Sequence, residues 1–438
     1  MPRSYPKTSK SLSFPNALVG NPGEVMIRPP TETFGGDNFG INSSTSSLQS
    51  ILILDAARSA IGSPFKSLKD FSAAQLGAVV IQHILKRTKI PKRFIGEVIF
   101  GNVVSAGTGQ NLSRQAAILA GLPVEVDAFT VNQVCGSGLR SLIVGAHSIM
   151  CGQTKAVIAG AAESASWNPF LYFDNEGEGV GGREKKKVES LVYDGLWCHL
   201  SEAHMGHLAE FIVEEYKISR QAQDEYALCS HQKACRAQRE GKFSKEIVPV
   251  AVSETKRFEK DERPRRNISN EKLAALPAAF RQDGTVTAGN SSAPCDGAAA
   301  VVLAQEDFVK HNRLTARAKI LGCASIALEP RKVFTAGVKA IQECLKRSRL
   351  TVQEIDLFEI SEAFAAQAIL TQQTIGIPEE KMNVWGGDIA LGHPLGAAGM
   401  RGLVTLMHAL QDRKKNKGIV SVCLGGGGAI ALAIEVIP

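Results

Sequence analysis

The sequence predicts an α/β protein in which helices cover a sheet. From about residue 50, apolar segments of strand length alternate with segments of helical length, and this alternation resumes from about residue 316. Such alternation is typical of domains whose helices pack against a sheet. Each of the two stretches also contains a cysteine beside a glycine-rich turn, which indicates an internal duplication at low sequence similarity.

The first stretch begins with a predicted buried strand at residues 51–55. Residues 72–88 are expected to form an amphipathic helix, because Leu76, Val80 and Ile84 fall on one side of it. Further strands are predicted at residues 98–104, 129–132 and 156–159, with an apolar helix at residues 138–150.

Residues 166–283 are more polar and contain charge runs such as residues 176–189, so we expect an insertion there. Within it, residues 218–242 are predicted to be helical, with Ser219 as the N-cap. The second stretch then repeats the alternating pattern. We expect strands at residues 320–325, 356–360, 418–422 and 429–436, and helices at residues 333–347, 362–374 and 395–410.

Composition limits the class of protein. The 438 residues suffice for a large core and more than one domain, and no apolar run is long enough for a transmembrane helix. The net charge of +7 suits an anionic ligand, but the basic cluster at 256–266 is short and mixed in sign, so nucleic-acid binding is not expected. The nine cysteines show neither a C-x-x-C pair nor zinc spacing. We therefore expect no metal site and a reducing compartment.

Residues 1–48 differ from the rest, because they are rich in Ser, Pro, Gly and Asn and lack a periodic apolar pattern. We expect a disordered segment or a surface arm. The absence of acidic residues before Glu24 is a feature of mitochondrial transit peptides, but prolines and scarce arginine argue against an amphipathic helix. The expectation is a cytoplasmic protein, with a mitochondrial location as the alternative.

Cys135 is the first candidate catalytic residue. It lies in the segment VNQVCGSG (131–138), where an apolar strand is predicted to run through a glycine turn into a helix. The positive end of the helix dipole would lower the pKa of the thiol below its free value of about 8.5 and favour the reactive thiolate. A buried packing cysteine is the competing interpretation.

Two later segments favour catalysis. His393 stands between Gly392 and Pro394 just before a predicted helix, where the helix dipole opposes a positive charge, so a neutral imidazole is expected. Cys423 precedes four glycines whose backbone N–H groups can hold an oxyanion or a phosphate. A turn between two strands is the simpler interpretation of these glycines.

Two cysteines, one histidine and two glycine-lined turns suit acyl transfer through a thioester. One thiol would carry the acyl group, the histidine would activate it, and the second thiol would move a proton. The same groups would serve a cysteine hydrolase, so these residues alone leave the substrate open.

With these motifs the chain resembles the thiolase family, and most closely its acetyl-CoA acetyltransferases, over about residues 49–438. The matching segments are VNQVCGSG (131–138), GHP (392–394), CLGGG (423–427), GQN (109–111) with RQ (114–115), TVTAGNSS (285–292) and SEAFA (361–365). The last of these segments, SEAFA, differs from the family's NEAFA at its first position.

The resemblance implies the five-layered αβαβα thiolase fold, built from two similar halves with an inserted loop domain. The family's members are dimers or tetramers, so a homodimer or homotetramer is expected. The implied domains are an N-terminal extension (1–48), a first half (49–164 with 295–315), a CoA-binding loop domain (165–294) and a second half (316–438).

The resemblance also implies the roles of the site residues. Cys135 would accept the acetyl group, His393 would activate it, and Cys423 would exchange a proton with the methyl carbon of the second acetyl-CoA. The N–H groups of Cys135 and Gly425 would form an oxyanion hole, and Ser361 stands where the family's asparagine holds a catalytic water. The implied substrate- and CoA-binding residues are Ser292, Ala288, Gly289, His204, Met205 and Phe364.

Three departures from the family pattern are visible. Ser361 replaces asparagine and has one donor instead of two, so we expect an active but slower enzyme whose turnover rises when asparagine is restored. Trp385 and Asp388 replace asparagine and alanine near His393, and Asp388 is expected to form a local hydrogen bond or to raise the pKa of a neighbour. Residues 160–165 (GAAESA) carry smaller side chains than the family's GGMESM.

The expected activity is the reversible condensation of two acetyl-CoA to acetoacetyl-CoA and CoA, a step of lipid metabolism, by a ping-pong route through S-acetyl-Cys135. CoA thioesters are then substrates, and no tightly bound cofactor is expected. The alternatives are a broad-chain 3-ketoacyl-CoA thiolase of fatty-acid degradation and a non-catalytic protein of the same fold. A ketoacyl-carrier-protein synthase would need a second histidine in place of Cys423.

Overall fold

The computed structural model describes residues 50–173 and 186–437. The segment 1–48, expected to be disordered, lies outside the described residues, as does most of the charge run at 176–189. None of the described helices is long and apolar enough to cross a membrane.

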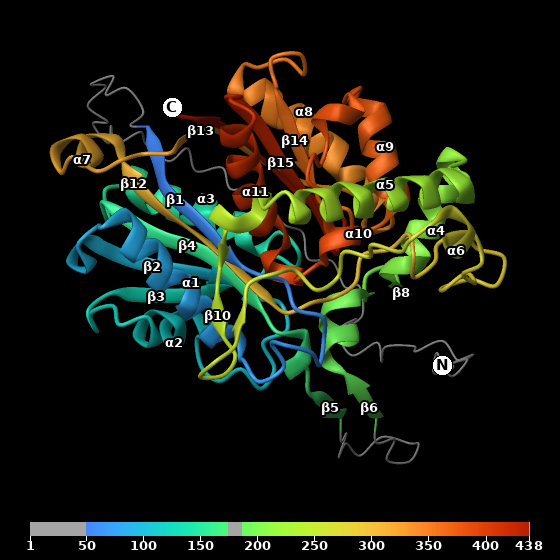
Figure 1. The fold of residues 1–438 in the computed structure, drawn as a ribbon, viewed down its shortest axis with the longest axis horizontal. Coiled ribbons are helices and arrows are strands. Elements are labelled where there is room, and N and C mark those ends of the chain that lie inside the picture. Colours follow the sequence, from blue (N-terminus) through green and yellow to red (C-terminus); the bar gives the residue numbers. More distant parts are fainter. Residues whose placement is uncertain (1–49, 174–185, 438) are drawn as a thin grey trace, which may run out of the picture. The chain divides into compact units, whose positions relative to one another are not determined.

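The predicted first half, residues 49–164 with 295–315, contributes five neighbouring strands to a sheet (Figure 1). Their order is β3-β2-β4-β12-β1, in which β2 is parallel to β3 and β4, and β12 is antiparallel to β4 and β1. The strands predicted here are present, although β2 begins and ends earlier than predicted. Their bounds are β1 Ile51–Ser59, β2 Ile95–Gly101, β3 Asp127–Val131, β4 Ala156–Glu163 and β12 Gly297–Gln305.

The second half repeats this arrangement in the order β14-β15-β16-β13. β14 is parallel to β15, whereas β15 pairs antiparallel with β16 and β16 pairs antiparallel with β13. Order and direction match those of β2-β4-β12-β1, so the predicted duplication is confirmed. The bounds are β13 Ala318–Ala327, β14 Leu357–Ile360, β15 Lys417–Leu424 and β16 Gly428–Val436.

Helices complete three further layers, which confirms the five-layered fold (Figure 1). α1 and α2 cover the outer face of the first set of strands, and α8, with α9 beside it, covers that of the second set. α3 and α11 pack against each other between the two sets. The bounds are α1 Ala73–Thr88, α2 Leu112–Leu119, α3 Ser137–Met150, α8 Ala336–Ser348, α9 Ala365–Ile375 and α11 Ala398–Asp412.

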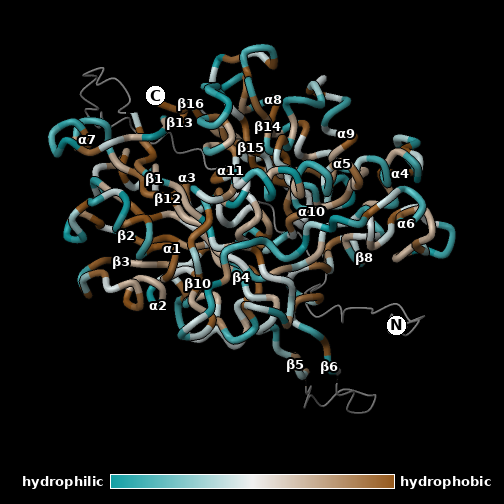
Figure 2. Tube along the Cα trace, in the orientation of Figure 1, coloured by the Kyte–Doolittle hydropathy of each residue, from teal (hydrophilic) through white to brown (hydrophobic). Residues whose placement is uncertain are grey.

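The two sets of strands join through β1 and β13, where Leu52 pairs with Lys319 and Ile53 with Ala318. Apolar residues follow the strands and the central helices, and hydrophilic residues lie mainly in the outer turns (Figure 2).

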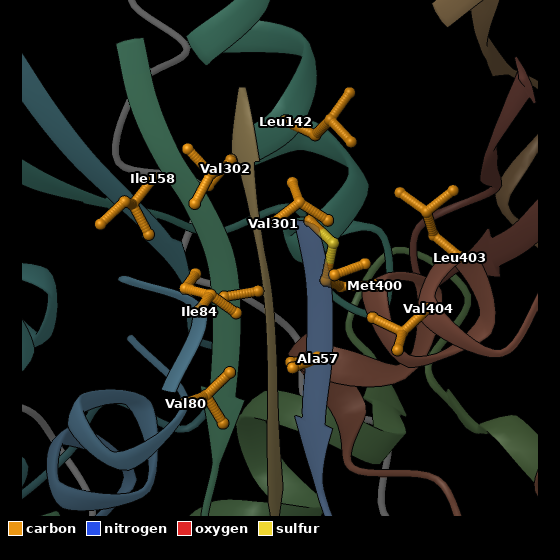
Figure 3. Close-up of a cluster of buried hydrophobic side chains, with 14 of the residues drawn as sticks. Ala57, Val80, Ile84, Leu142, Ile158, Val301, Val302, Met400, Leu403 and Val404 are labelled. Atoms are coloured by element: carbon orange, nitrogen blue, oxygen red, sulfur yellow. The ribbon is translucent and has the colours of Figure 1, made fainter. Parts of the chain in front are cut away.

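The core includes β12, whose residues are buried along its whole length. Its sequence GAAAVVLAQ is apolar without alternation, as expected for a strand covered on both faces. Figure 3 shows Met400 and Val404 of α11 and Leu142 of α3 near Val301 of β12 and Ala57 of β1. This packing holds the N-termini of α3 and α11, and the loops that precede them, in fixed positions.

The polar segment forms an insertion between β4 and β12, and its described residues include the α-helices α4, α5 and α6. Ser219 caps α5, because its side chain accepts a hydrogen bond from the Ala222 N–H (3.1 Å), as predicted. The domain boundaries given above stay predictions. The remaining elements are β5 Phe170–Phe173, β6 Lys186–Glu189, β7 Trp197–Cys198, β8 Ala203–His204, α4 Met205–Tyr216, α5 Arg220–Arg239, β9 Ile247–Val248, β10 Val250–Ala251, β11 Arg257–Phe258, α6 Asn270–Ala274, α7 Glu306–His311 and α10 Asp388–Leu391.

The three helices predicted in the second stretch begin three residues later than expected. Residues 330–335 form a 3-10 helix before α8, residues 395–397 form one before α11, and α9 starts only at Ala365. The cause at α9 is tertiary, because the Ala365 N–H donates its hydrogen bond to the Asn290 carbonyl in the insertion (2.9 Å).

Candidate active site

The loop that carries Cys135 connects β3 to α3, as predicted. Val134 adopts a left-handed conformation with a φ of 48°, which is rare for valine and persists only where neighbouring contacts fix it. The Ser137 hydroxyl donates a hydrogen bond to the Val134 carbonyl (2.6 Å), and the Val134 N–H donates one to Asn132 Oδ1 (2.9 Å). The turn leaves Cys135 partly exposed just before α3.

His393 lies in a second loop, between α10 and α11. Its N–H donates a hydrogen bond to the Ala293 carbonyl (2.9 Å), which ties the loop to the insertion. The preceding Gly392 has a φ of 101°, and a Cβ there would lie 2.5 Å from the Cys295 sulfur. Only glycine fits this turn, so the position of His393 is set by backbone contacts on both sides.

The structure brings Cys135 and His393 together. The His393 ring is buried, its Nδ1 lies 3.0 Å from Asp388 Oδ2, and it also makes a hydrogen bond to Cys135. Burial lowers the pKa of His393, but the negative charges of Cys135 and Asp388 and the hydrogen bonds to both raise it to about 10. The expected neutral imidazole is therefore wrong, because the negative charges of Cys135 and then of Asp388, with the hydrogen bonds to both, outweigh the effect of burial.

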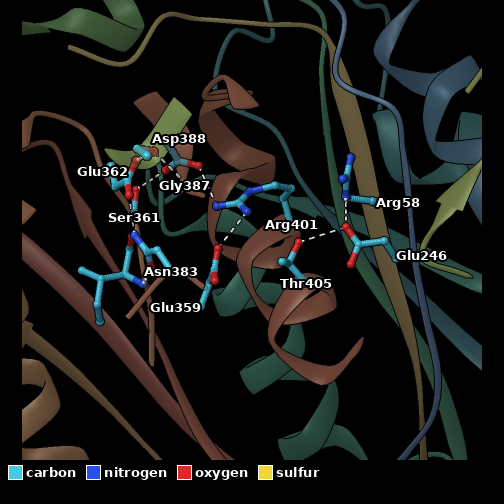
Figure 4. A network of polar contacts seen from close by, with 12 residues as sticks. Arg58, Glu246, Glu359, Ser361, Glu362, Asn383, Gly387, Asp388, Arg401 and Thr405 are labelled. Atoms are coloured by element: carbon cyan, nitrogen blue, oxygen red, sulfur yellow. Dashed lines mark hydrogen bonds and ion pairs between the residues drawn. The ribbon is translucent and has the colours of Figure 1, made fainter. Parts of the chain in front are cut away.

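Asp388 belongs to the network of buried polar contacts in Figure 4. Its Oδ1 accepts a hydrogen bond from Arg401 (2.8 Å), and its Oδ2 accepts one from the Ser361 hydroxyl (2.5 Å). Burial raises the pKa of Asp388, yet the charges of Arg401 and His393 outweigh burial and lower that pKa to about 2. Both expectations for Asp388, a local hydrogen bond and a raised pKa in a neighbour, are confirmed.

The other departures lie in the packing around this network. Trp385 is buried, with its ring edge-on to Phe243 at a centroid separation of 5.8 Å. Within residues 160–165, Gly160 allows close approach, since a Cβ there would lie 2.6 Å from the Ala299 carbonyl oxygen. β4 and β12 can therefore pair tightly beside the site.

The glycines after Cys423 form the turn between β15 and β16. The turn lies between two strands, with φ angles of 86° at Gly426 and 97° at Gly427, and the oxyanion role of these glycines stays a prediction. The turn still adjoins the nucleophile loop, because a Cβ on Gly425 would lie 3.3 Å from Val134 Cγ1. The duplicated halves thus place their glycine turns side by side.

Cys423 lies close enough to Cys135 and Asp388 to interact with their negative charges. Burial raises the pKa of its thiol, and negative charge at Cys135 and Asp388 raises it further. Phe334 and Phe364 belong to the apolar cluster around it. Such a thiol holds its proton firmly, and its thiolate, once formed, is a strong base.

A row of rings lines this apolar cluster. The imidazole of His204 stacks on Phe280 with ring centroids 5.0 Å apart, and Phe364 lies 6.1 Å from Phe280 and 5.1 Å from Phe334. His204 also caps α4, because its Nδ1 accepts a hydrogen bond from the Gly206 N–H (3.1 Å). Burial, and then the charge of a neighbouring histidine, lower the pKa of His204 to about 4, so the ring is neutral.

The predicted CoA-binding residues of the TVTAGNSS segment lie in a loop against the same cluster. The Ser292 N–H donates to the Ala363 carbonyl (3.0 Å), which places half-buried Ser292 next to Phe364. Ala288 is exposed, whereas Gly289 is buried and a Cβ there would lie 2.5 Å from Leu276. Met205 is half-buried and packs against the cluster that contains Cys423.

Sequence reasoning missed the buried charges behind the site. Arg401 is 1% exposed within α11 and donates hydrogen bonds to Glu359 (2.9 Å) as well as to Asp388. A single arginine in the otherwise apolar stretch AAGMRGLVTLM was the available signal, because a lone buried charge needs a charged partner.

Glu163 is a second buried carboxylate that the sequence did not reveal. It accepts hydrogen bonds from the N–H groups of Val103, Val104 and Gly396 (3.0 Å each) and from the Asn102 amide (2.9 Å). Glu163 therefore joins the loop after β2 to the segment after His393.

Replacing Glu163 by alanine should lower the free energy of unfolding by about 3 kcal/mol, because several buried donors lose their acceptor together. Urea unfolding followed by circular dichroism measures this change. An unchanged midpoint would show that water replaces the carboxylate at no cost.

Comparison with known proteins gives an independent result. Residues 51–307 match the family model of the thiolase N-terminal domain, and residues 314–436 match that of the thiolase C-terminal domain. A Staphylococcus aureus protein named probable acetyl-CoA acyltransferase is 45% identical over 389 residues, which are 88% of this chain and 98% of that protein.

Solved structures agree with this match. The crystal structure of Bacillus anthracis acetyl-CoA acetyltransferase has a TM-score of 0.85 at 36% identity and covers 89% of this chain and 99% of its own. Human mitochondrial 3-ketoacyl-CoA thiolase in complex with CoA has a TM-score of 0.86 at 35% identity, with the same coverage of 89% and 99%.

Proposed function

Because this chain belongs to the thiolase family and is an acyltransferase, we propose that it is an acetyl-CoA C-acetyltransferase that condenses two acetyl-CoA to acetoacetyl-CoA and CoA. The observation that carries the proposal is the meeting of Cys135, His393 and Cys423 at one centre, although they come from three separate segments. The reaction is reversible, and its reverse is thiolysis.

The first half-reaction transfers an acetyl group to Cys135. The thiol proton passes to His393, and the Cys135 sulfur attacks the carbonyl carbon of acetyl-CoA. The carbon–sulfur bond to CoA breaks, and the CoA thiolate takes the proton of Cys423. Acetyl-Cys135, protonated His393 and the Cys423 thiolate remain. The raised pKa of His393 supports this step, because it keeps the ring protonated beside the sulfur.

The second half-reaction forms the carbon–carbon bond. The Cys423 thiolate removes a proton from the methyl carbon of the second acetyl-CoA, and that carbon attacks the acetyl group on Cys135. The Cys135 sulfur leaves as acetoacetyl-CoA forms and regains its proton from His393. A weakly acidic carbon needs a strong base, and the raised pKa of Cys423 supports this role.

The developing oxyanion needs donors fixed before the reaction. We assign the N–H groups of Cys135 and Gly425 to this role, because the turns that carry them adjoin at Val134. CoA would lie along the loop that holds Ala288, Gly289 and Ser292, as a substrate rather than as a bound cofactor.

The rings near Cys423 favour a short acyl chain, because Phe280, Phe334 and Phe364 pack edge to face there. His204 and Met205 border the same cluster. We further propose a homotetramer or homodimer in the cytoplasm, acting in lipid metabolism, with residues 1–48 as the reason to keep the mitochondrial alternative.

The substrate is tested by thiolysis with purified protein and free CoA. The value of kcat/KM for acetoacetyl-CoA should exceed that for a long-chain 3-ketoacyl-CoA by about 100-fold, since the rings packed near Cys423 would exclude the longer chain. Equal or better cleavage of the long substrate would favour the 3-ketoacyl-CoA thiolase alternative, which the similar human enzyme suggests. Cleavage of neither would favour the non-catalytic alternative.

A further inference from the structure

We propose that Asp388 is a positioning residue of this reaction: it orients His393 so that Nε2 faces the Cys135 thiol, while Ser361 holds the Asp388 carboxylate in place. The proposal rests on the proposed function, because it concerns the same nucleophile. It joins two departures from the family pattern, Ser361 and Asp388, which the structure connects by a direct hydrogen bond.

The first step of the argument is the tautomer of His393. A carboxylate only accepts hydrogen bonds, so the 3.0 Å contact between Nδ1 and Asp388 Oδ2 requires the hydrogen to lie on Nδ1. The hydrogen bond to Cys135 is then made by Nε2. A carboxylate on the far nitrogen fixes the ring orientation and stabilises its protonated form.

The second step is that Asp388 is itself held rigidly. It receives hydrogen bonds from the Ser361 hydroxyl after β14 and from Arg401 in α11, in addition to its contact with His393. Arg401 is also bound by Glu359 of β14. All five side chains are buried, so a rotation of Asp388 would leave buried charges without partners.

The third step concerns the charges that face these groups. The His393 ring meets Asp388 on one side and Cys135 on the other, and the Glu163 carboxylate is close enough to interact with its charge. The negative groups outnumber the positive ones around the ring, so a proton on His393 is favoured. The charged neighbours of Asp388 are Arg401, His393, Glu359 and Glu362.

The fourth step concerns Ser361. A serine hydroxyl has one hydrogen to donate, and here it is donated to Asp388 Oδ2. The hydroxyl cannot donate to a substrate oxygen at the same time, so Ser361 acts through Asp388. Asparagine at position 361 could also donate to Asp388 through its amide, and the expectation that asparagine raises turnover stays a prediction.

Replacing Asp388 by asparagine tests the proposal, since the amide has nearly the same shape but no charge. Two quantities are measured: the pH dependence of Cys135 alkylation by iodoacetamide, and kcat and KM for acetoacetyl-CoA thiolysis. Without the carboxylate, His393 loses its proton at lower pH, so alkylation at neutral pH should slow about tenfold or more. The value of kcat should fall about 10²- to 10⁴-fold, with little change in KM.

Asp356→Asn is the matched control. The Asp356 carboxylate accepts hydrogen bonds from the N–H groups of Asn416 and Lys417 (3.0 Å each), at the start of β15. Cys423 lies near the other end of that strand. Like Asp388→Asn, this variant replaces a hydrogen-bonded carboxylate by an amide, here one with two backbone partners. It should leave the alkylation rate and kcat unchanged.

Ser361→Ala is the second variant, and it removes only the hydroxyl. It should lower kcat about tenfold and slow alkylation in the same direction as Asp388→Asn, because the carboxylate loses one of its fixed donors. If Asp388→Asn does not fold, unchanged kcat and alkylation in Ser361→Ala overturn the proposal.

Alkylation of Cys135 needs no CoA substrate. Its rate therefore tests the positioning role of Asp388 independently of the proposed acetyltransferase activity. Slower alkylation in a folded Asp388→Asn variant of a protein that does not cleave acetoacetyl-CoA would support the positioning role and reject the substrate. Unchanged alkylation and kcat in a protein that cleaves acetoacetyl-CoA would reject the positioning role and leave the function in place.

Discussion

Replacing Cys135 by alanine is expected to abolish acetoacetyl-CoA thiolysis while the protein stays folded. No acyl-enzyme can form without the thiol, and losing the nucleophile of a catalytic group that acts as a unit lowers kcat by about 10⁴-fold or more. Thiolysis is followed as the loss of acetoacetyl-CoA in the presence of free CoA. Mass spectrometry after incubation with acetyl-CoA should show one added acetyl group on the unmodified protein and none on the variant.

Cys151→Ala is the control for this experiment. Cys151 is exposed at the opposite end of α3 from Cys135, so this variant should keep both the acetyl group and the turnover. Full turnover in Cys135→Ala would remove Cys135 as the nucleophile, whatever the mass spectra show.

Replacing Cys423 by alanine should separate the two half-reactions. Carbon–carbon bond formation is expected to fall about 10²- to 10⁴-fold, because the base that removes the methyl proton is lost. Acetylation of Cys135 should fall less, since a CoA thiolate leaves readily even without a proton donor. Condensation rates and the exchange of acetyl-CoA methyl hydrogens with deuterated water are measured, and that exchange should disappear.

Cys198→Ala is the matched control for the cavity that Cys423→Ala creates. Cys198 is buried in the same apolar cluster as Cys423, so both variants remove a buried sulfur there. Methyl-hydrogen exchange should persist in Cys198→Ala. Equal losses in the two variants would attribute the effect to packing and would remove Cys423 as the base.

The fold was largely predictable because its signals are local. Strand β15 and helix α3 are apolar segments bounded by glycine or polar turns, and each lies close to its predicted bounds. The errors occur where distant segments intervene. Helix α9 starts late because Ala365 bonds to Asn290, a contact across 75 residues that no local pattern records.

The proposed reacting side chains could be named from the sequence, because Cys135, His393 and Cys423 each stand in a short glycine-rich segment, and their catalytic roles stay predictions. The protonation state of His393 was not predictable, since the local signal was the helix dipole, whereas the charges that raise its pKa are those of Cys135 and then of the buried Asp388 carboxylate. Roles for individual CoA-binding residues such as Ser292 stay predictions.

By itself, the sequence determined the α/β class, the duplication and the candidate nucleophile, because periodicity and short motifs depend on neighbouring residues. Only the tertiary structure decided how Ser361, Asp388 and Arg401 meet behind His393. The physical reason is burial. Charges enclosed in a core interact strongly across any separation in sequence, and their pairing depends on how the central helix α11 packs between the two sets of strands.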